Sequence, residues 1–122
     1  MKFSGVVKKN LGRGRKLGYP TANIDIDKSV PDGLFLGITE IKNKKYPSLI
    51  FVGAPETFNE NYRRAESYLL NFKGDLYDQE ISMETIKKLR DNKKFETQEA
   101  LVAQMRQDEQ VAREFFRNYN LK

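Results

Sequence analysis

Residues 34–53, LFLGITEIKNKKYPSLIFVG, contain two runs of strand-forming residues joined by a short polar segment. The first run, Leu34–Ile41, alternates between two faces with the period of two that a β-strand requires. The second, Tyr46–Gly53, is typical of a buried strand because it contains the apolar run Leu49–Val52. Asn43–Lys45 is a polar connection between them, so the stretch predicts an antiparallel hairpin.

Strand patterns continue on both sides of this hairpin. Phe3–Lys8 and Ala22–Ile26 precede it, and Ala65–Phe72 and Glu80–Leu89 follow it. Val30-Pro31-Asp32-Gly33 is a turn signal, since proline presets φ and glycine accepts positive φ. Six short strands about ten residues apart, followed by one helical segment, predict a closed antiparallel barrel with a covering helix.

The helix is expected from Thr97 onward. Thr97 can cap its start, and Glu99 lies where the helix dipole favours an acid. An apolar stripe with helical spacing, interrupted by Asp108, predicts packing against the sheet; it consists of Leu101, Met105, Ala112 and Phe116.

The strand pattern Ala65–Phe72 places a carboxylate in an otherwise apolar or aromatic row. Glu66, Tyr68, Leu70 and Phe72 share one face, which we expect to face the core. Glu66 then lies either at the rim of the core or in an ion pair with a nearby cation.

A glycine-rich basic loop, Gly12–Gly18, leads into the tetrapeptide Pro20-Thr21-Ala22-Asn23. Glycines let backbone N–H groups approach an anion, and neutral oxygens suit a hard cation such as Mg²⁺ beside phosphates. The loop lacks the Lys-Ser or Lys-Thr of a P-loop, and the proline prevents the helix start of a dinucleotide-binding motif. A solvated turn, with Thr21 and Asn23 in local hydrogen bonds, is the alternative. The predicted phosphate-binding residues are Gly12, Gly14, Arg15, Lys16, Gly18, Pro20 and Thr21, and the predicted metal ligands are Thr21 and Asn23.

The composition fits one domain covering residues 1–122 and limits its chemistry. No apolar run is long enough for a membrane span and no signal-peptide pattern is present, so we expect a cytoplasmic protein without a membrane role. The absence of cysteine and histidine excludes disulfides, zinc-thiolate sites and the commonest general base. A net charge of +5 fits a polyanionic ligand, either a nucleotide or a nucleic acid.

Several blocks, in order from Phe3 to Arg113, make the chain resemble the riboflavin kinase domain that bacteria often fuse to an FAD synthetase domain. Gly14–Ile24 is similar to the family signature, and Glu66–Phe72 to the strand that carries its catalytic glutamate. The other matching blocks are Ser4–Val7, Pro31–Phe35, Leu76-Tyr77, Leu89-Arg90 with Phe95, and Leu101 with Asp108.

The resemblance implies a six-stranded Greek-key barrel with a C-terminal α-helix, and an enzyme that transfers the γ-phosphoryl group of ATP to the 5′-hydroxyl of riboflavin. The products would be FMN and ADP, and the cofactor Mg²⁺. Glu66 would be the general base, Thr21 and Asn23 would bind the metal and phosphates, and Arg90 and Phe95 would contact the flavin. Without the resemblance, Arg90 could be a surface cation and Phe95 a core residue.

The chain also departs from the family pattern at several positions. Gly53–Phe58 has one residue more than the family's Gly-x-x-Pro-Thr-Phe segment, and Tyr68 stands where histidine is frequent. Gly33-Leu34-Phe35 lacks the hydroxyl of Gly-Val-Tyr, and Asp78 follows Tyr77 where glycine is usual. Since the metal segment and the base are retained, we expect an active enzyme.

Two other classes of function remain open. One is a non-catalytic flavin- or nucleotide-binding barrel. The other is a basic barrel that binds single-stranded nucleic acid through Tyr46, Phe51, Tyr68 and Phe72, which is disfavoured because half of these aromatics lie on the predicted inward face. We expect a monomer that is either a stand-alone kinase or a domain fused to, or associated with, an FAD synthetase domain.

Overall fold

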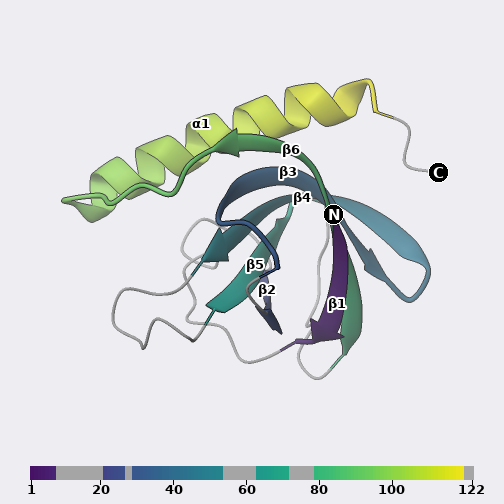
Figure 1. Cartoon of the computed structure of the whole chain (residues 1–122). Coiled ribbons are helices and arrows are strands. Elements are labelled where there is room, and N and C mark those ends of the chain that lie inside the picture. The colour runs from purple at the N-terminus through teal and green to yellow at the C-terminus, as the bar shows by residue number, and fades with distance from the viewer. Residues whose placement is uncertain (8–20, 27–28, 54–62, 72–78, 120–122) are drawn as a thin grey trace.

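The computed structural model describes residues 1–7, 21–26, 29–53, 63–71 and 79–119 of the chain. Within these ranges the predicted strands and helix are present, with ends that differ from the expected ones by a few residues (Figure 1). In chain order the elements are β1 (Lys2–Val6), β2 (Thr21–Ile26), β3 (Gly33–Ile41), β4 (Lys44–Gly53), β5 (Arg63–Leu69), β6 (Glu80–Arg90) and α1 (Gln98–Arg117).

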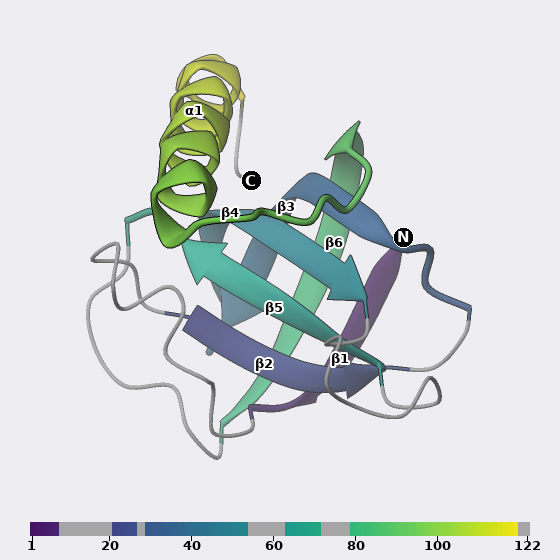
Figure 2. The same ribbon diagram turned by 90° about the vertical axis from the view of Figure 1, so that its left-hand side faces the viewer.

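The six strands form one antiparallel sheet in the order β1-β6-β3-β4-β5-β2. β3, β4 and β5 are a meander and β6 returns to lie beside β3, which is a Greek-key arrangement. Figure 2 shows β2, β5 and β4 side by side in one wall of the curled sheet. The two edge strands also meet, because a Cβ added to Gly5 would lie 3.2 Å from Cβ of Ile24. The predicted barrel with a C-terminal helix is therefore confirmed, and the barrel is nearly closed.

The hairpin between β3 and β4 turns one position earlier than predicted. Lys42 and Asn43 have φ values of 49° and 69°, and they form a two-residue turn between the paired residues Ile41 and Lys44. Positive φ at both central residues is the type I′ geometry, whose twist matches that of the flanking strands. Lys44 and Lys45, predicted to be in the connection, belong to β4.

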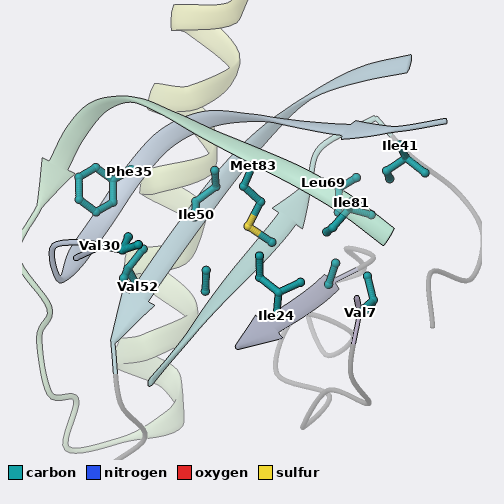
Figure 3. Packing of buried hydrophobic residues seen from close by; sticks show 12 residues of the cluster. Val7, Ile24, Val30, Phe35, Ile41, Ile50, Val52, Leu69, Ile81 and Met83 are labelled. Atoms are coloured by element: carbon teal, nitrogen blue, oxygen red, sulfur yellow. The ribbon is translucent and has the colours of Figure 1, made fainter. Parts of the chain in front are cut away.

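Aliphatic side chains fill the inside of the barrel, and Figure 3 shows Ile24, Ile50 and Met83 converging there. A group of three buried hydroxyls lies on the same inward faces. Thr39 Oγ1 is 2.6 Å from Ser67 Oγ and accepts a hydrogen bond of 2.8 Å from Ser48 Oγ. These hydroxyls satisfy one another, as buried polar groups must.

A second apolar layer lies between the outside of the barrel and α1, which runs along the barrel over β6, β3 and β4 (Figure 1). Thr97 caps this helix as predicted, since its Oγ1 accepts a hydrogen bond of 3.1 Å from the Ala100 amide. Met105 and Ala112, from the predicted stripe, are buried in this layer. Its sheet residues are Leu34, Leu36, Leu49, Tyr68 and Leu70.

The orientation predicted for β5 needs correction. The row that begins with Glu66 and Tyr68 is buried, but it faces the outer layer, whereas Ala65 and Leu69 point into the barrel. The error arose because both faces of β5 are covered, so alternation of polarity could not indicate which of them faces inward. Phe72, the fourth residue of the predicted row, lies outside the described residues.

We predict that Gly37→Ala destabilises the fold by about 2 kcal/mol or more. A Cβ at this inward position would overlap the Ile50 side chain and lie 2.5 Å from the Glu84 carbonyl oxygen, which is backbone and cannot rotate away. Urea unfolding measures the loss of free energy. Gly5→Ala, whose Cβ would meet nothing closer than 3.2 Å, is the comparison and should lose less; an equal loss in both would contradict the packing argument.

Candidate functional site

The predicted metal ligand Asn23 and the predicted base Glu66 face each other on neighbouring strands. β2 and β5 are antiparallel, and their register places Asn23 directly opposite Glu66 and Thr21 opposite Tyr68. Directly opposed residues point to the same side of a sheet with Cβ atoms about 5 Å apart. The three candidate site residues Thr21, Asn23 and Glu66 therefore lie together on the outer face of the barrel wall, and all three are buried.

The Asn23 amide is the most unusual polar group of this face. The side chain is 1% exposed, and neither its oxygen nor its nitrogen has a hydrogen-bond partner among the described residues. Leaving a buried polar group unpaired costs roughly 1–3 kcal/mol, so such a group in a stable fold usually has a ligand or a function to explain it.

The donors on this face also fit the type of metal that the sequence predicted. Thr21 and Asn23 supply neutral oxygens, and Glu66, 7% exposed, supplies a carboxylate. Within the described ranges no three acidic side chains gather closely enough to chelate an ion by themselves. Mg²⁺ is commonly held by few protein oxygens together with substrate phosphates, and this donor set is compatible with that mode of binding.

The facing pair is one end of a longer row that crosses five strands. Phe51 on β4 is opposite Glu66, Leu34 on β3 is opposite Phe51, and Arg90 on β6 is opposite Leu34. Four strand spacings of about 4.8 Å give the row a length of roughly 19 Å along the sheet. The structure thus places the candidate metal ligand, the candidate base and a candidate flavin contact on one line: Asn23, Glu66, Phe51, Leu34 and Arg90.

Arg90, predicted to contact a flavin, is held by the helix. Its Nη2 donates to Asp108 Oδ2 at 2.9 Å and its Nε to Asp108 Oδ1 at 3.3 Å, and Gln104 Nε2 donates to the same Oδ1 at 3.1 Å. The guanidinium carbon also lies 5.9 Å from the centre of the Phe95 ring, which brings the two predicted flavin contacts together. The alternative of an unattached surface cation does not describe Arg90.

Sequence reasoning assigned no part in a flavin or phosphate site to Phe51, which it named only in the nucleic-acid alternative, and it assigned no role to Asp108. The interruption of the helical stripe was the available signal for Asp108, because residues 101, 105, 108, 112 and 116 continue one face without a break. The structure buries Asp108 on that face at 4% exposure and pairs it with Arg90. For Phe51 no signal existed, since only the strand register brings it beside Glu66.

The segment between β6 and α1 is hydrogen-bonded to the end of β4. Asn92 Nδ2 donates to the Val52 carbonyl oxygen at 3.0 Å, and Figure 2 shows the segment passing along this side of the barrel. Nearby, Lys88 hydrogen-bonds the exposed Asp91 carboxylate at 2.5 Å, which holds the pKa of that carboxyl below its ordinary value. This segment carries Phe95 and leads the chain from Arg90 to the helix.

The predicted phosphate-binding loop lies outside the described residues, so its contacts stay predictions. It comprises Gly12, Gly14, Arg15, Lys16, Gly18 and Pro20; of the predicted phosphate-binding residues, Thr21 alone falls in a described range. Two departures from the family pattern, the extra residue within Gly53–Phe58 and the Tyr77-Asp78 pair, likewise fall mostly or wholly outside the described residues.

Comparison with known proteins identifies this barrel: the chain belongs to the riboflavin kinase family. A family model described as "Flavokinase: Riboflavin kinase" matches residues 1–116. A protein of Buchnera aphidicola subsp. Schizaphis graminum, named a bifunctional riboflavin kinase/FMN adenylyltransferase, is 33% identical over 121 residues. That match covers 93% of this chain and 38% of the relative, and the chain spans less than half the length of the other curated relatives compared with it.

Two solved structures are similar over nearly the whole chain. One, named a macrolide-efflux protein of Streptococcus pneumoniae, has a TM-score of 0.80 at 31% identity, over 98% of this chain and 39% of that one. The other, a riboflavin kinase from Trypanosoma brucei, has a TM-score of 0.65 at 22% identity, over 96% of this chain and 80% of that one. The second likeness supports the fold alone. No helix within the described ranges is long and apolar enough to cross a membrane.

We predict that Asn23→Leu stabilises the ligand-free protein by about 1–3 kcal/mol, the usual cost of an unpaired buried polar group. Leucine keeps the branching of asparagine and removes two polar atoms that have no hydrogen-bond partner within the described ranges. Asn92→Leu is the matched control and should lower stability, because the Asn92 amide donates to the Val52 carbonyl. Both are measured by urea unfolding without ligand. If Asn23→Leu destabilises as Asn92→Leu does, Asn23 has a structural partner.

Proposed function

We propose that this chain is a riboflavin kinase, which transfers the γ-phosphoryl group of ATP to the 5′-hydroxyl of riboflavin and releases FMN and ADP. The observation that carries the proposal is the register pair of Asn23 and Glu66 on the outer wall of the barrel, where an amide with no hydrogen-bond partner among the described residues faces a carboxylate. Family membership supports the choice of riboflavin as the acceptor.

Phosphoryl transfer depends mainly on charge neutralisation and in-line positioning, and the chain offers residues for both. Glu66 orients the ribityl 5′-hydroxyl and accepts its proton as the new oxygen–phosphorus bond forms. The bond between the γ-phosphorus and the bridging oxygen breaks, and that oxygen leaves with ADP. With no histidine in the chain, a carboxylate is the natural base.

The metal and the triphosphate would bind at the β2 end of the row. Thr21 and Asn23 would hold Mg²⁺, which supplies charge neutralisation on the phosphates when it is bound. The glycines and cations of Gly12–Gly18 immediately precede β2 in sequence and would add backbone N–H groups and positive charge for the triphosphate.

The strand register supports one direction for the acceptor. In an in-line transfer the attacking and leaving oxygens are on opposite sides of the phosphorus. With the triphosphate on the Asn23 side of Glu66, the body of riboflavin extends the other way, across Phe51 and Leu34 toward Arg90. The flavin ring would then lie near three groups suited to an aromatic plane, namely the Phe51 ring, the Phe95 ring and the Arg90 guanidinium.

The two alternatives receive less support. Tyr68 is 5% exposed, and Tyr46 and Phe51 are only partly exposed, so these aromatics do not offer the open stacking surface that single-stranded nucleic acid needs. A non-catalytic flavin-binding barrel would not require a carboxylate buried opposite Asn23. Incubation with riboflavin, ATP and Mg²⁺, followed by chromatography, tests the proposal; flavin fluorescence quenching without FMN would favour the non-catalytic alternative.

We predict that Glu66→Gln lowers kcat at least about a hundredfold, the usual contribution of one general base, while riboflavin and ATP still bind. FMN production gives the rate, and flavin fluorescence quenching gives the binding. Glu84→Gln removes an exposed carboxylate from β6 and should leave the rate unchanged. A Glu66→Gln rate close to that of the parent protein would remove Glu66 from the mechanism.

We predict that Phe51→Ala raises the KM for riboflavin roughly three- to tenfold, the scale of one lost aromatic contact, and leaves the KM for ATP unchanged. Phe35→Leu on the inward face is the control: it should lower stability without changing the KM for riboflavin, because Phe35 lies inside the barrel. An equal rise in both Michaelis constants for Phe51→Ala would contradict the assigned direction of the acceptor.

A further inference from the structure

Asp108 is a buried carboxylate that the proposed chemistry does not use. It is 4% exposed, on the face of α1 that packs against the barrel, between the buried residues Met105 and Ala112. Burying a carboxylate is costly unless it is paired and hydrogen-bonded, and a helix that only covered a sheet would have an apolar residue at this position. The contacts of Asp108 therefore indicate why an acid is here.

Those contacts converge on one group, the guanidinium of Arg90. Both carboxylate oxygens accept from it, at 2.9 and 3.3 Å, and Gln104 donates to one of the two oxygens at 3.1 Å. Such a two-point contact fixes the plane of a guanidinium as well as its position, which a lysine could not reproduce. The carboxylate and the amide thus form a fixed support behind Arg90.

Arg90 lies next to a β-bulge at the end of β6. The pairing of β3 with β6 shifts register between Leu34 and Phe35, so β6 contains an extra residue immediately before Arg90. A bulge of this kind changes the direction in which the following side chain points. The arginine is thereby placed on the row that contains Glu66, beside the Phe95 ring and within reach of α1.

We propose that Asp108 is a positioning residue for the acceptor substrate: it holds the Arg90 guanidinium, and through it Phe95, at the end of the row where the flavin ring of riboflavin binds. This inference rests on the proposed function and on the direction assigned to the acceptor. It assigns Asp108 no contact with ATP, metal or the reacting atoms. Loss of Asp108 consequently weakens riboflavin binding and leaves the phosphoryl-donor side of the site unchanged.

The test compares Asp108→Asn with Glu109→Gln in full steady-state kinetics. Glu109 is the next residue of the helix, and it pairs with Arg113 away from the row. We expect Asp108→Asn to raise the KM for riboflavin about tenfold, the scale seen when support behind a binding group is removed, with the KM for ATP and kcat within about twofold of the parent values. Glu109→Gln should change none of the three constants.

A double-mutant cycle separates positioning from general support of the fold. If Asp108 acts through Arg90, then Asp108→Asn adds little to the riboflavin KM once Arg90→Gln is present. Gln104→Leu, which removes the second donor to Asp108 without changing charge, is the milder variant to use if Asp108→Asn does not fold, and it should shift the riboflavin KM in the same direction by a smaller factor.

The outcomes distinguish this inference from the proposed function. Absence of FMN formation by the parent protein overturns the proposed function and, with it, this inference. FMN formation with an unchanged riboflavin KM in Asp108→Asn, or with riboflavin and ATP affected equally, overturns the inference alone. Additive effects of Asp108→Asn and Arg90→Gln would also overturn it, because they would show that Asp108 acts by another route.

Discussion

The antiparallel pairing of β2 with β5 is the interaction on which the rest of the structure depends. It brings the strand that follows the glycine-rich loop beside the strand that carries Glu66, although more than forty residues separate Asn23 from Glu66 in the sequence. A shift of one residue would turn every side chain of β2 to the other face, so that Asn23 would enter the apolar barrel and Ile24 would leave it. The apolar interior therefore enforces the register that places Asn23 opposite Glu66, because Ala22 and Ile24 must stay inside.

Under the proposed function, the demands of stability and of chemistry differ at this pair. The barrel interior pairs its own polar groups, as Thr39, Ser48 and Ser67 show, whereas Asn23 is buried on the outer face without a hydrogen-bond partner in the described part of the chain. Local rules of folding are most often broken where a protein binds or reacts. This contrast is expected if the polar groups of the interior maintain the fold and Asn23 belongs to the proposed site.

Much of the fold could be predicted from the sequence, and the reasons for the errors are physical. Period-two alternation and turn residues located the strands, and Thr97 located the start of the helix. The inward face of β5 was assigned wrongly because its other face is also buried, with Tyr68 in the apolar layer that contains Met105 and Ala112. The hairpin turn was displaced by one residue because lysine is an unusual residue at positive φ, and nothing in the sequence marks Lys42 as the residue that adopts it.

The candidate site was predictable in part. A family resemblance suggested Glu66, Thr21, Asn23, Arg90 and Phe95, and the structure puts the first three together and the last two together. The line joining the two groups depends on the registers of four strand pairs, which no local pattern encodes. For the same reason Phe51 was overlooked, and Asp108 was taken for a break in the stripe although it belongs to it.

The coverage of both faces of β3, β4 and β5 has a consequence for how this protein can diverge over evolutionary time. A half-exposed sheet can accept new side chains on its solvated face at little cost, but here a strand such as β3 (Gly33–Ile41) has almost no solvated position. Inherited changes on these strands must satisfy either the barrel interior or the layer under the helix. We therefore expect substitutions to accumulate in the segments that connect the strands, while the strands keep their geometry as the rest of the sequence changes.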